Sequence, residues 1–198
     1  MISAQSSHWQ SQVNQFSNQI KSTPKGKIVF LGNSITEGFD LAAAFPKTRP
    51  INRGIISDNL DGVLDRLDSS VVVLQPSQLF ILIGINDIGR GDTDSLIISR
   101  YRTLISRLHL DIKSTKIYLV SILPTSVKWS NCPKEKIERI NQHISDLAKE
   151  FNCEWMDINH LFADASGYLK DKFSPDGLHL NTVGYEIWIK ELQKLGLE

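Results

Sequence analysis

Several features that would point to particular classes of protein are scarce or missing in this sequence. Lysine plus arginine and aspartate plus glutamate are equal, at 22 each, so the chain has no net charge to attract nucleic acid or an anionic membrane. No apolar run approaches the roughly 20 residues that a bilayer-spanning helix needs. The polar N-terminal segment lacks the apolar core of a signal peptide. We therefore expect neither a nucleic-acid partner nor a membrane span. The location stays open between the cytoplasm and a secreted or periplasmic site reached with a signal since removed.

The sequence has only two cysteines, Cys132 and Cys153, and the segment between them is expected to be helical. A helix of that length would separate the two residues by roughly 27 Å. A disulfide needs Cα atoms within about 7 Å of each other. We therefore expect two free thiols, and the absence of paired Cys and His spacings argues against a structural zinc site.

What the chain does contain is an alternation of short apolar segments and helical periodicities. Hydrophobic residues make up 41% of it, enough for the core of one ordinary domain. Apolar runs predict strands at 27–31, 79–83 and 116–123. A weaker strand is expected at 50–53, and a fifth at 153–156. Helices are expected at 3–20, from a Ser57 cap through Leu67, at 94–110, at 133–150 with Pro133 in the first turn, and from an Asn181 cap to Leu195.

This alternation implies a parallel five-stranded sheet with helices on both faces, a three-layer α/β/α sandwich. We expect residues 1–198 to form a single domain, with residues 1–25 as an N-terminal helix packed on it. In such sheets, ligands bind beyond the carboxyl ends of the strands. The residues that follow each strand are therefore the candidates for chemistry.

Three such residues are Ser34, Gly54 and Asn86, which follow the first, second and third predicted strands. Ser34 offers a hydroxyl, Gly54 an unobstructed backbone N–H, and Asn86 a side-chain amide. Each also has a simpler explanation. Ser34 can cap a short helix, Gly54 can serve only the turn, and Asn86 can bond its own backbone.

A fourth segment, SPDGLHLN at 174–181, contains Asp176 and His179 three residues apart. In a helical turn this spacing places both side chains on one side, so that the carboxylate can orient the imidazole as a base. A surface His beside an Asp is the alternative. The combination of a nucleophile, a base, a carboxylate and amide donors at one predicted sheet edge favours a serine hydrolase.

The sequence at these points resembles the SGNH hydrolases, also called GDSL-type esterases and lipases. Their four blocks are similar to GNSIT with Ser34, NRGIISD with Gly54, GIND with Asn86, and DGLHLN with Asp176 and His179. The resemblance extends from about residue 27 to about residue 195. It implies a flavodoxin-like three-layer fold.

The resemblance also implies roles and a substrate class. Ser34 would be the nucleophile, His179 the base and Asp176 its orienting partner, with the N–H groups of Ser34 and Gly54 and the amide of Asn86 as oxyanion hole. This chemistry needs no metal or organic cofactor. The Asn before the serine, in place of the commoner Asp, resembles the branch of platelet-activating-factor acetylhydrolases and bacterial carbohydrate acetylesterases. We therefore expect cleavage of short acyl esters of small molecules or carbohydrates, with a lysophospholipase or thioesterase as the alternative.

Other interpretations remain at this stage. A nucleotide or flavin binder on the same fold is disfavoured because the chain lacks both G-x-G-x-x-G and G-K-[ST]. A domain without activity is disfavoured by the complete set of catalytic residue types. His160, with Asp157 three residues before it, is a second candidate base. Trp129 can stack on a sugar or cover the core, and the aromatic side chains that follow the serine block, Phe39 and Phe45, can line an acyl pocket or pack.

Overall fold

Five parallel strands form the centre of the computed structural model, which describes residues 6–198. They are β1 (Ile28–Gly32), β2 (Ile51–Gly54), β3 (Gln78–Leu82), β4 (Lys116–Val120) and β5 (Glu154–Met156). Their order in the sheet is β2-β1-β3-β4-β5, and every neighbouring pair is parallel. This is the flavodoxin-like order, so the predicted α/β/α class is confirmed.

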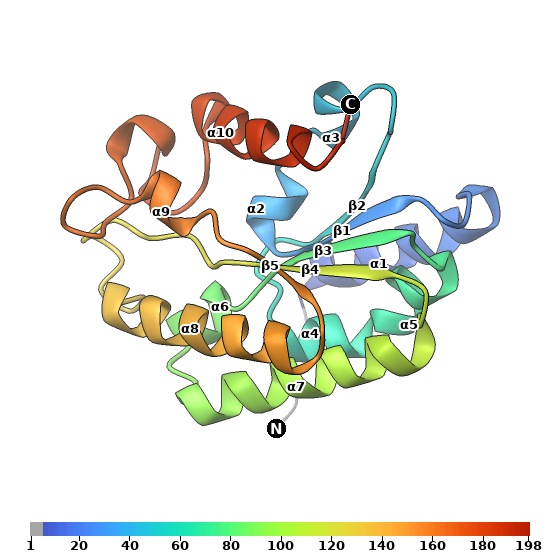
Figure 1. Ribbon diagram of the computed structural model, residues 1–198, viewed down its shortest axis with the longest axis horizontal. Helices are drawn as coiled ribbons and strands as arrows, with labels where there is room; N and C mark the ends of the chain where they lie inside the picture. The colour runs from blue at the N-terminus through green and yellow to red at the C-terminus, as the bar shows by residue number, and fades with distance from the viewer. Residues whose placement is uncertain (1–5) are drawn as a thin grey trace.

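Helices cover both faces of the sheet (Figure 1). The lower layer in that view contains α1 (Ser7–Gln19), α4 (Leu60–Asp65), α5 (Leu67–Ser70), α6 (Ile85–Gly89), α7 (Asp94–Asp111) and α8 (Lys134–Glu150). The upper layer contains α2 (Ser34–Glu37), α3 (Leu41–Ala44), α9 (Asn159–Phe162) and α10 (Thr182–Gln193). The start of the helix predicted at 3–20 lies partly outside the described residues.

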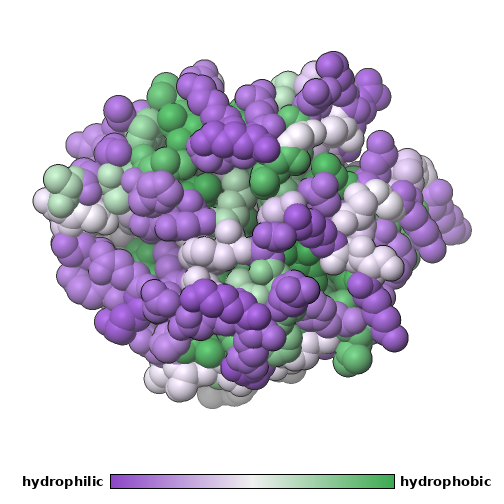
Figure 2. Space-filling model, viewed as in Figure 1, coloured by the Kyte–Doolittle hydropathy of each residue, from purple (hydrophilic) through white to green (hydrophobic). Residues whose placement is uncertain are grey.

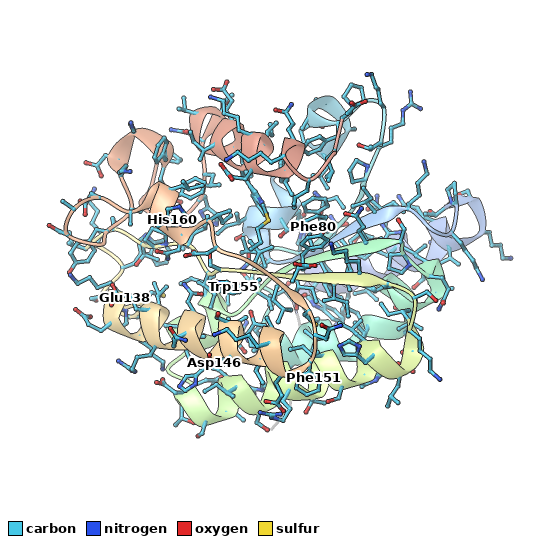
Figure 3. All side chains as sticks on the ribbon, viewed as in Figure 1. Phe80, Glu138, Asp146, Phe151, Trp155 and His160 are labelled. Atoms are coloured by element: carbon cyan, nitrogen blue, oxygen red, sulfur yellow. The ribbon has the colours of Figure 1, made fainter. Side chains whose placement is uncertain are left out.

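Side chains alternate along each strand, so each layer packs against its own apolar core. On the lower face Leu31 and Ile81 join a cluster with the long helices α7 and α8. On the upper face Phe80 stacks between Phe30, at a centroid distance of 4.7 Å, and Tyr118, at 4.4 Å. Figure 3 shows Phe80 at the upper face of the sheet. The face of the molecule shown in Figure 2 is mainly hydrophilic, with hydrophobic residues exposed in smaller patches among the polar ones.

One predicted helix start is wrong, and the helix that follows is shorter than expected. Ser57 has a left-handed φ of 62°, and Asn59 is the cap, accepting the Gly62 N–H at 3.0 Å. The expected helix also breaks at Arg66, between α4 and α5. The guanidinium of Arg66 turns inward to bond carbonyl groups at the strand ends, as described below.

Most other local predictions agree with the structure, and one differs by a single residue. Asn181 caps α10 by accepting the Gly184 N–H at 3.0 Å. Pro133 stands directly before α8 rather than inside its first turn. Cys132 and Cys153 are both free thiols, as expected. Across the described residues no helix has the length and apolar character needed to cross a membrane.

Candidate active site

A hydroxyl, an imidazole and a carboxylate form one chain of hydrogen bonds beyond the carboxyl end of β1. Ser34 Oγ lies 2.9 Å from His179 Nε2, across 145 residues of sequence. On the other side of the ring, His179 Nδ1 lies 2.6 Å from Asp176 Oδ2. The structure thus brings together the three residues that the sequence suggested as a catalytic set, with Ser34 half-buried.

The Asp176 carboxylate is held in its ionised form. Its second oxygen accepts the backbone N–H groups of Leu178 at 2.9 Å and His179 at 2.8 Å. Burial alone would raise the pKa of Asp176. The hydrogen bonds from the His179 ring and from these N–H groups outweigh it and lower that pKa to about 2. Since it keeps its charge near neutral pH, the carboxylate favours the tautomer that has a proton on Nδ1 and leaves Nε2 facing Ser34.

Neighbouring loops fix the backbone that carries this pair. Gly177 has a φ of 83°, and a Cβ there would lie 2.1 Å from Ser126 Oγ, so a larger residue would be strained and displaced. The Ser126 N–H donates to the Gly177 carbonyl at 2.8 Å. Trp129 donates its Nε1–H to the Asp176 carbonyl at 3.0 Å and packs against the lower core. Trp129 therefore supports the Asp176 loop and covers core, which is one of the two roles considered from the sequence.

Ser34 is not a helix cap. Asn33 is the cap of α2, and its Oδ1 accepts the Ile35 N–H at 3.0 Å. Ser34 is the first residue of α2, a position where a backbone N–H has no acceptor within the helix. The capping explanation for Ser34 therefore fails, and its N–H points out of the helix start.

Gly54 lies where the sequence placed it, at the end of β2, but its N–H is already bonded. It donates to Asn52 Oδ1 at 2.8 Å. A Cβ on Gly54 would lie 2.1 Å from Glu37 N, so glycine is needed for the close approach of β2 and α2. An oxyanion role for Gly54 requires Asn52 to share or release this hydrogen.

Asn52 itself was missed by sequence reasoning, although it stands in the NRG motif. Its Nδ2 donates to the carbonyl groups of Thr36, at 2.6 Å, and Phe39, at 3.0 Å. These hydrogen bonds connect the end of α2 and the residues after it to β2. Asparagine is uncommon in strands, and its presence in this strand was the only sequence feature that could have pointed to Asn52.

Asn86 is the second residue of α6, just beyond β3, the neighbour of β1. Its Nδ2 donates to the Asp58 carbonyl at 2.8 Å, across 28 residues, so the local turn bond considered from the sequence is not formed. A side-chain amide has two N–H groups. One is fixed by Asp58, which leaves the second for a ligand at this edge of the sheet.

A buried ion pair lies behind these loops. Arg66 Nε donates to Asp58 Oδ2 at 2.8 Å, and both side chains are almost fully buried. Arg66 Nη2 also donates to the carbonyl groups of Arg53, at 2.8 Å, and Gly32, at 3.2 Å. The pair therefore connects the carboxyl ends of β1 and β2. Sequence reasoning missed it, because charges flanking a short helix usually face solvent.

Asp87, next to Asn86, is a second buried carboxylate. Its two oxygens each lie 3.2 Å from the Leu60 N–H at the start of α4, and Arg100 Nη1 lies 3.5 Å from Oδ1. Burial raises the pKa of Asp87 to about 7, although the Leu60 N–H and Arg100 act to lower it.

This raised pKa predicts a pH-dependent stability. An unfolded aspartate has a pKa of about 3.9, so between pH 4 and 7 the folded protein retains a proton that the unfolded chain has released. The contribution of Asp87 to the free energy of unfolding should be largest below about pH 4 and fall as the pH rises to about 7. Between pH 5 and 7 the fall is about 2–3 kcal/mol.

Urea unfolding of wild type and Asp87→Asn at pH 5 and pH 8 measures this effect. The side chain of the variant does not titrate. The free energy of unfolding of the wild type, relative to that of the variant, should therefore be lower at pH 8 than at pH 5. An identical gap at both pH values would contradict the prediction.

The remaining candidate residues lie outside this hydrogen-bonded set. His160 Nδ1 lies 3.5 Å from Asp157 Oδ2, and its side chain is 65% exposed. His160 is on α9 (Figure 3), and the imidazole that contacts Ser34 is that of His179. Phe39 and Phe45 are buried in the upper core, so their role is to pack against the other apolar side chains there. Within residues 6–198, no three His, Cys, Asp or Glu side chains are grouped to hold a metal ion.

Comparison with known proteins places this arrangement in context. Residues 30–187 match the model of the GDSL-like lipase/acylhydrolase family. No curated protein sequence matches the chain significantly.

Solved structures resemble the fold closely. One is a structure from Streptococcus pneumonia whose description names platelet activating factor. It is 27% identical in sequence, with a TM-score of 0.89, and the match covers 95% of this chain and 92% of that one. A GDSL-like lipase from Bacteroides thetaiotaomicron is 21% identical, with a TM-score of 0.80, over 92% and 96%. An acetylxylan esterase from Geobacillus stearothermophilus is 20% identical, with a TM-score of 0.72, over 89% and 96%.

Proposed function

Because the chain belongs to the GDSL-like lipase/acylhydrolase family and is therefore an ester-bond hydrolase, we propose that Ser34 is its nucleophile, His179 its general base and Asp176 the carboxylate that orients the base. The observation that carries this proposal is the hydrogen bond of 2.9 Å between Ser34 Oγ and His179 Nε2. A serine hydroxyl is a poor nucleophile until an adjacent base removes its proton. In this arrangement the base is already in contact with it.

The reaction then proceeds in two halves. Ser34 Oγ attacks the ester carbonyl while its proton passes to His179 Nε2, and Asp176 stabilises the imidazolium that forms. His179 returns the proton to the leaving alcohol, and an acyl-enzyme remains on Ser34. A water molecule, deprotonated by the same imidazole, releases the acid and restores the hydroxyl.

The negative oxygen of each tetrahedral intermediate needs hydrogen-bond donors. We assign this role to the Ser34 N–H at the start of α2 and to the second N–H of the Asn86 amide. Both donors are fixed before substrate binds, which is what makes oxyanion stabilisation effective. The third donor suggested by the sequence, the Gly54 N–H, would take part by sharing its hydrogen between Asn52 and the oxyanion.

Labelling of the nucleophile tests this mechanism directly. A fluorophosphonate or sulfonyl fluoride should inactivate the enzyme, and peptide mapping by mass spectrometry should find one adduct, on Ser34. His179→Ala should label far more slowly, because the hydroxyl loses its base. An adduct on another serine, or rapid labelling of the His179 variant, would contradict the assignment.

For the substrate, we infer a short acyl group, acetyl above all, on a small molecule or a carbohydrate. Support comes from the Asn33-Ser34 variant of the first block and from the likeness to a structure described as an acetylxylan esterase. The alternative within the family is a lysophospholipase or a thioesterase.

Acyl-chain preference separates these substrates. In a series of p-nitrophenyl esters, kcat/KM should be greatest for acetate or propionate and fall steadily with longer chains. A maximum at chains of about eight carbons or more would favour a lipid substrate and defeat the short-acyl inference. Release of acetate from acetylated xylo-oligosaccharides would extend the result to carbohydrate.

A further inference from the structure

Helix α1 precedes the part of the chain that matches the family model, yet one of its side chains reaches the scaffold of the proposed oxyanion hole. We propose that Trp9 is a positioning residue, which acts through Asp58 to orient the Asn86 amide. This inference rests on the proposed function, because it concerns the same active site.

The path from Trp9 to Asn86 passes through one residue. Trp9 Nε1 donates to Asp58 Oδ1 at 2.9 Å. The backbone carbonyl of that same Asp58 accepts the Asn86 amide at 2.8 Å. A rotation or shift of Asp58 would therefore change the direction of the remaining Asn86 N–H, to which we assign the oxyanion role.

Asp58 depends on its donors because it is buried, with 2% of its surface exposed. A buried carboxylate is stable only when it is paired and its oxygens accept hydrogen bonds. Arg66 supplies the pair at Oδ2, while Trp9 and the Asn59 N–H supply the donors at Oδ1. Trp9 is the one contributor among these that comes from α1.

The space for this contact is kept open by Gly62 on α4. A Cβ at that position would lie 2.0 Å from Asp58 Oδ1 and 3.2 Å from Trp9 Nε1. Glycine is otherwise unfavourable inside a helix by about 1 kcal/mol relative to alanine. The contact between Trp9 and Asp58 thus explains a residue that the helix alone would not favour.

A second connection joins α1 to the helix that carries Ser34. His8 Nε2 lies 2.9 Å from Glu37 Oε1, and Gln12 Nε2 donates to the same oxygen at 3.2 Å. Glu37 in turn accepts the Ile56 N–H from the loop that leads to Asp58. Helix α1 therefore contacts both α2, which begins at Ser34, and the 55–59 loop, whose Asp58 carbonyl accepts the Asn86 amide.

Trp9→Phe tests the proposal, because it retains the ring and removes the N–H. With p-nitrophenyl acetate we expect kcat to fall roughly tenfold and KM to change by less than about twofold, since the lost interaction acts in the transition state. The matched control is Trp155→Phe, the same change at a half-buried tryptophan on β5 (Figure 3), which should leave kcat unchanged.

A double-mutant cycle with Asn86→Ala decides whether Trp9 acts through the amide. Asn86→Ala alone should lower kcat by about 10²–10³, as typical for loss of an oxyanion donor. Adding Trp9→Phe to it should cost less than about twofold more, because the group being oriented is gone. If Trp9→Phe instead lowers kcat tenfold in both the wild-type and the Asn86→Ala background, its effect is a general structural one and the proposal is overturned. An unchanged kcat in Trp9→Phe would also overturn it.

Gly62→Ala provides a second route that leaves α1 intact, and it decides the matter if Trp9→Phe does not fold. The added methyl group displaces the Asp58 carboxylate, so kcat should again fall roughly tenfold and the effect should again disappear in Asn86→Ala. Unchanged turnover in a folded Gly62→Ala would count against the proposal. Wild-type protein with no esterase activity and no label on Ser34 would instead reject the proposed function itself.

Discussion

Replacement of Ser34 with alanine is expected to lower kcat for p-nitrophenyl acetate by about 10⁶-fold, while the protein keeps its fold. The hydroxyl bonded to His179 is that of Ser34. Without it, the remaining rate would come from substrate binding and the oxyanion donors alone. The Ser34 side chain is half-buried at the start of α2, and its removal leaves the Asn33 cap intact. Circular dichroism and urea unfolding should therefore match wild type.

Two comparisons sharpen this expectation. Ser130→Ala, at an exposed loop position before α8, is the matched control and should retain full turnover. The double variant Ser34→Ala/His179→Ala should be no more than a few-fold slower than either single variant, because the two residues act as one unit. Retention of more than about 1% of wild-type kcat by Ser34→Ala would mean that another residue is the nucleophile.

Replacement of Asp176 with asparagine is expected to cost about 10⁴ in kcat with little change in overall structure. The asparagine amide can donate to the imidazole, which favours the tautomer with its proton on Nε2, facing Ser34. That tautomer cannot accept the serine proton. The effect should be seen at neutral pH, because the pKa of Asp176, lowered to about 2, keeps the wild-type carboxylate ionised there.

Asp157→Asn is the matched control for this variant. Asp157 and His160 have the same i,i+3 spacing as Asp176 and His179, but their ring-to-carboxylate distance is 3.5 Å, and among residues 6–198 no serine is hydrogen-bonded to the His160 ring. Turnover should be unchanged in Asp157→Asn. Equal losses in the two variants would contradict the assignment of His179 as the base.

The depressed pKa of Asp176 also has a stability consequence with a definite sign. The unfolded carboxyl group has a pKa of about 3.9, so below that value the unfolded chain takes up a proton that the folded protein resists. Asp176 therefore stabilises the fold above about pH 4, and this contribution is lost as the pH falls toward 2. Its side chain is 43% exposed, so solvent screening keeps the contribution small.

The fold was predictable because its signals are local. Continuous apolar runs identified the central strands β1, β3 and β4, and the predicted segments overlap all five observed strands. Errors fell where a tertiary contact overrides a local preference. Ser57 looks like a cap but takes a left-handed φ of 62°, and Asn59 caps α4 instead.

For the site, the sequence by itself determined which residue types gather at the carboxyl edge of the sheet. Ser34, Asn86, Asp176 and His179 follow from strand ends, from short spacings and from the resemblance to SGNH blocks. These signals need only the order of residues along the chain, since parallel strands bring their ends to one edge.

Only the tertiary structure decided which donors and acceptors are engaged. It shows the Gly54 N–H bonded to Asn52, the Asn86 amide held by the Asp58 carbonyl, and Trp9 bonded to a carboxylate 49 residues away. The physical reason is that a buried polar group must find a partner, and which partner lies within 3 Å depends on how distant segments pack. No local pattern of residues encodes that distance.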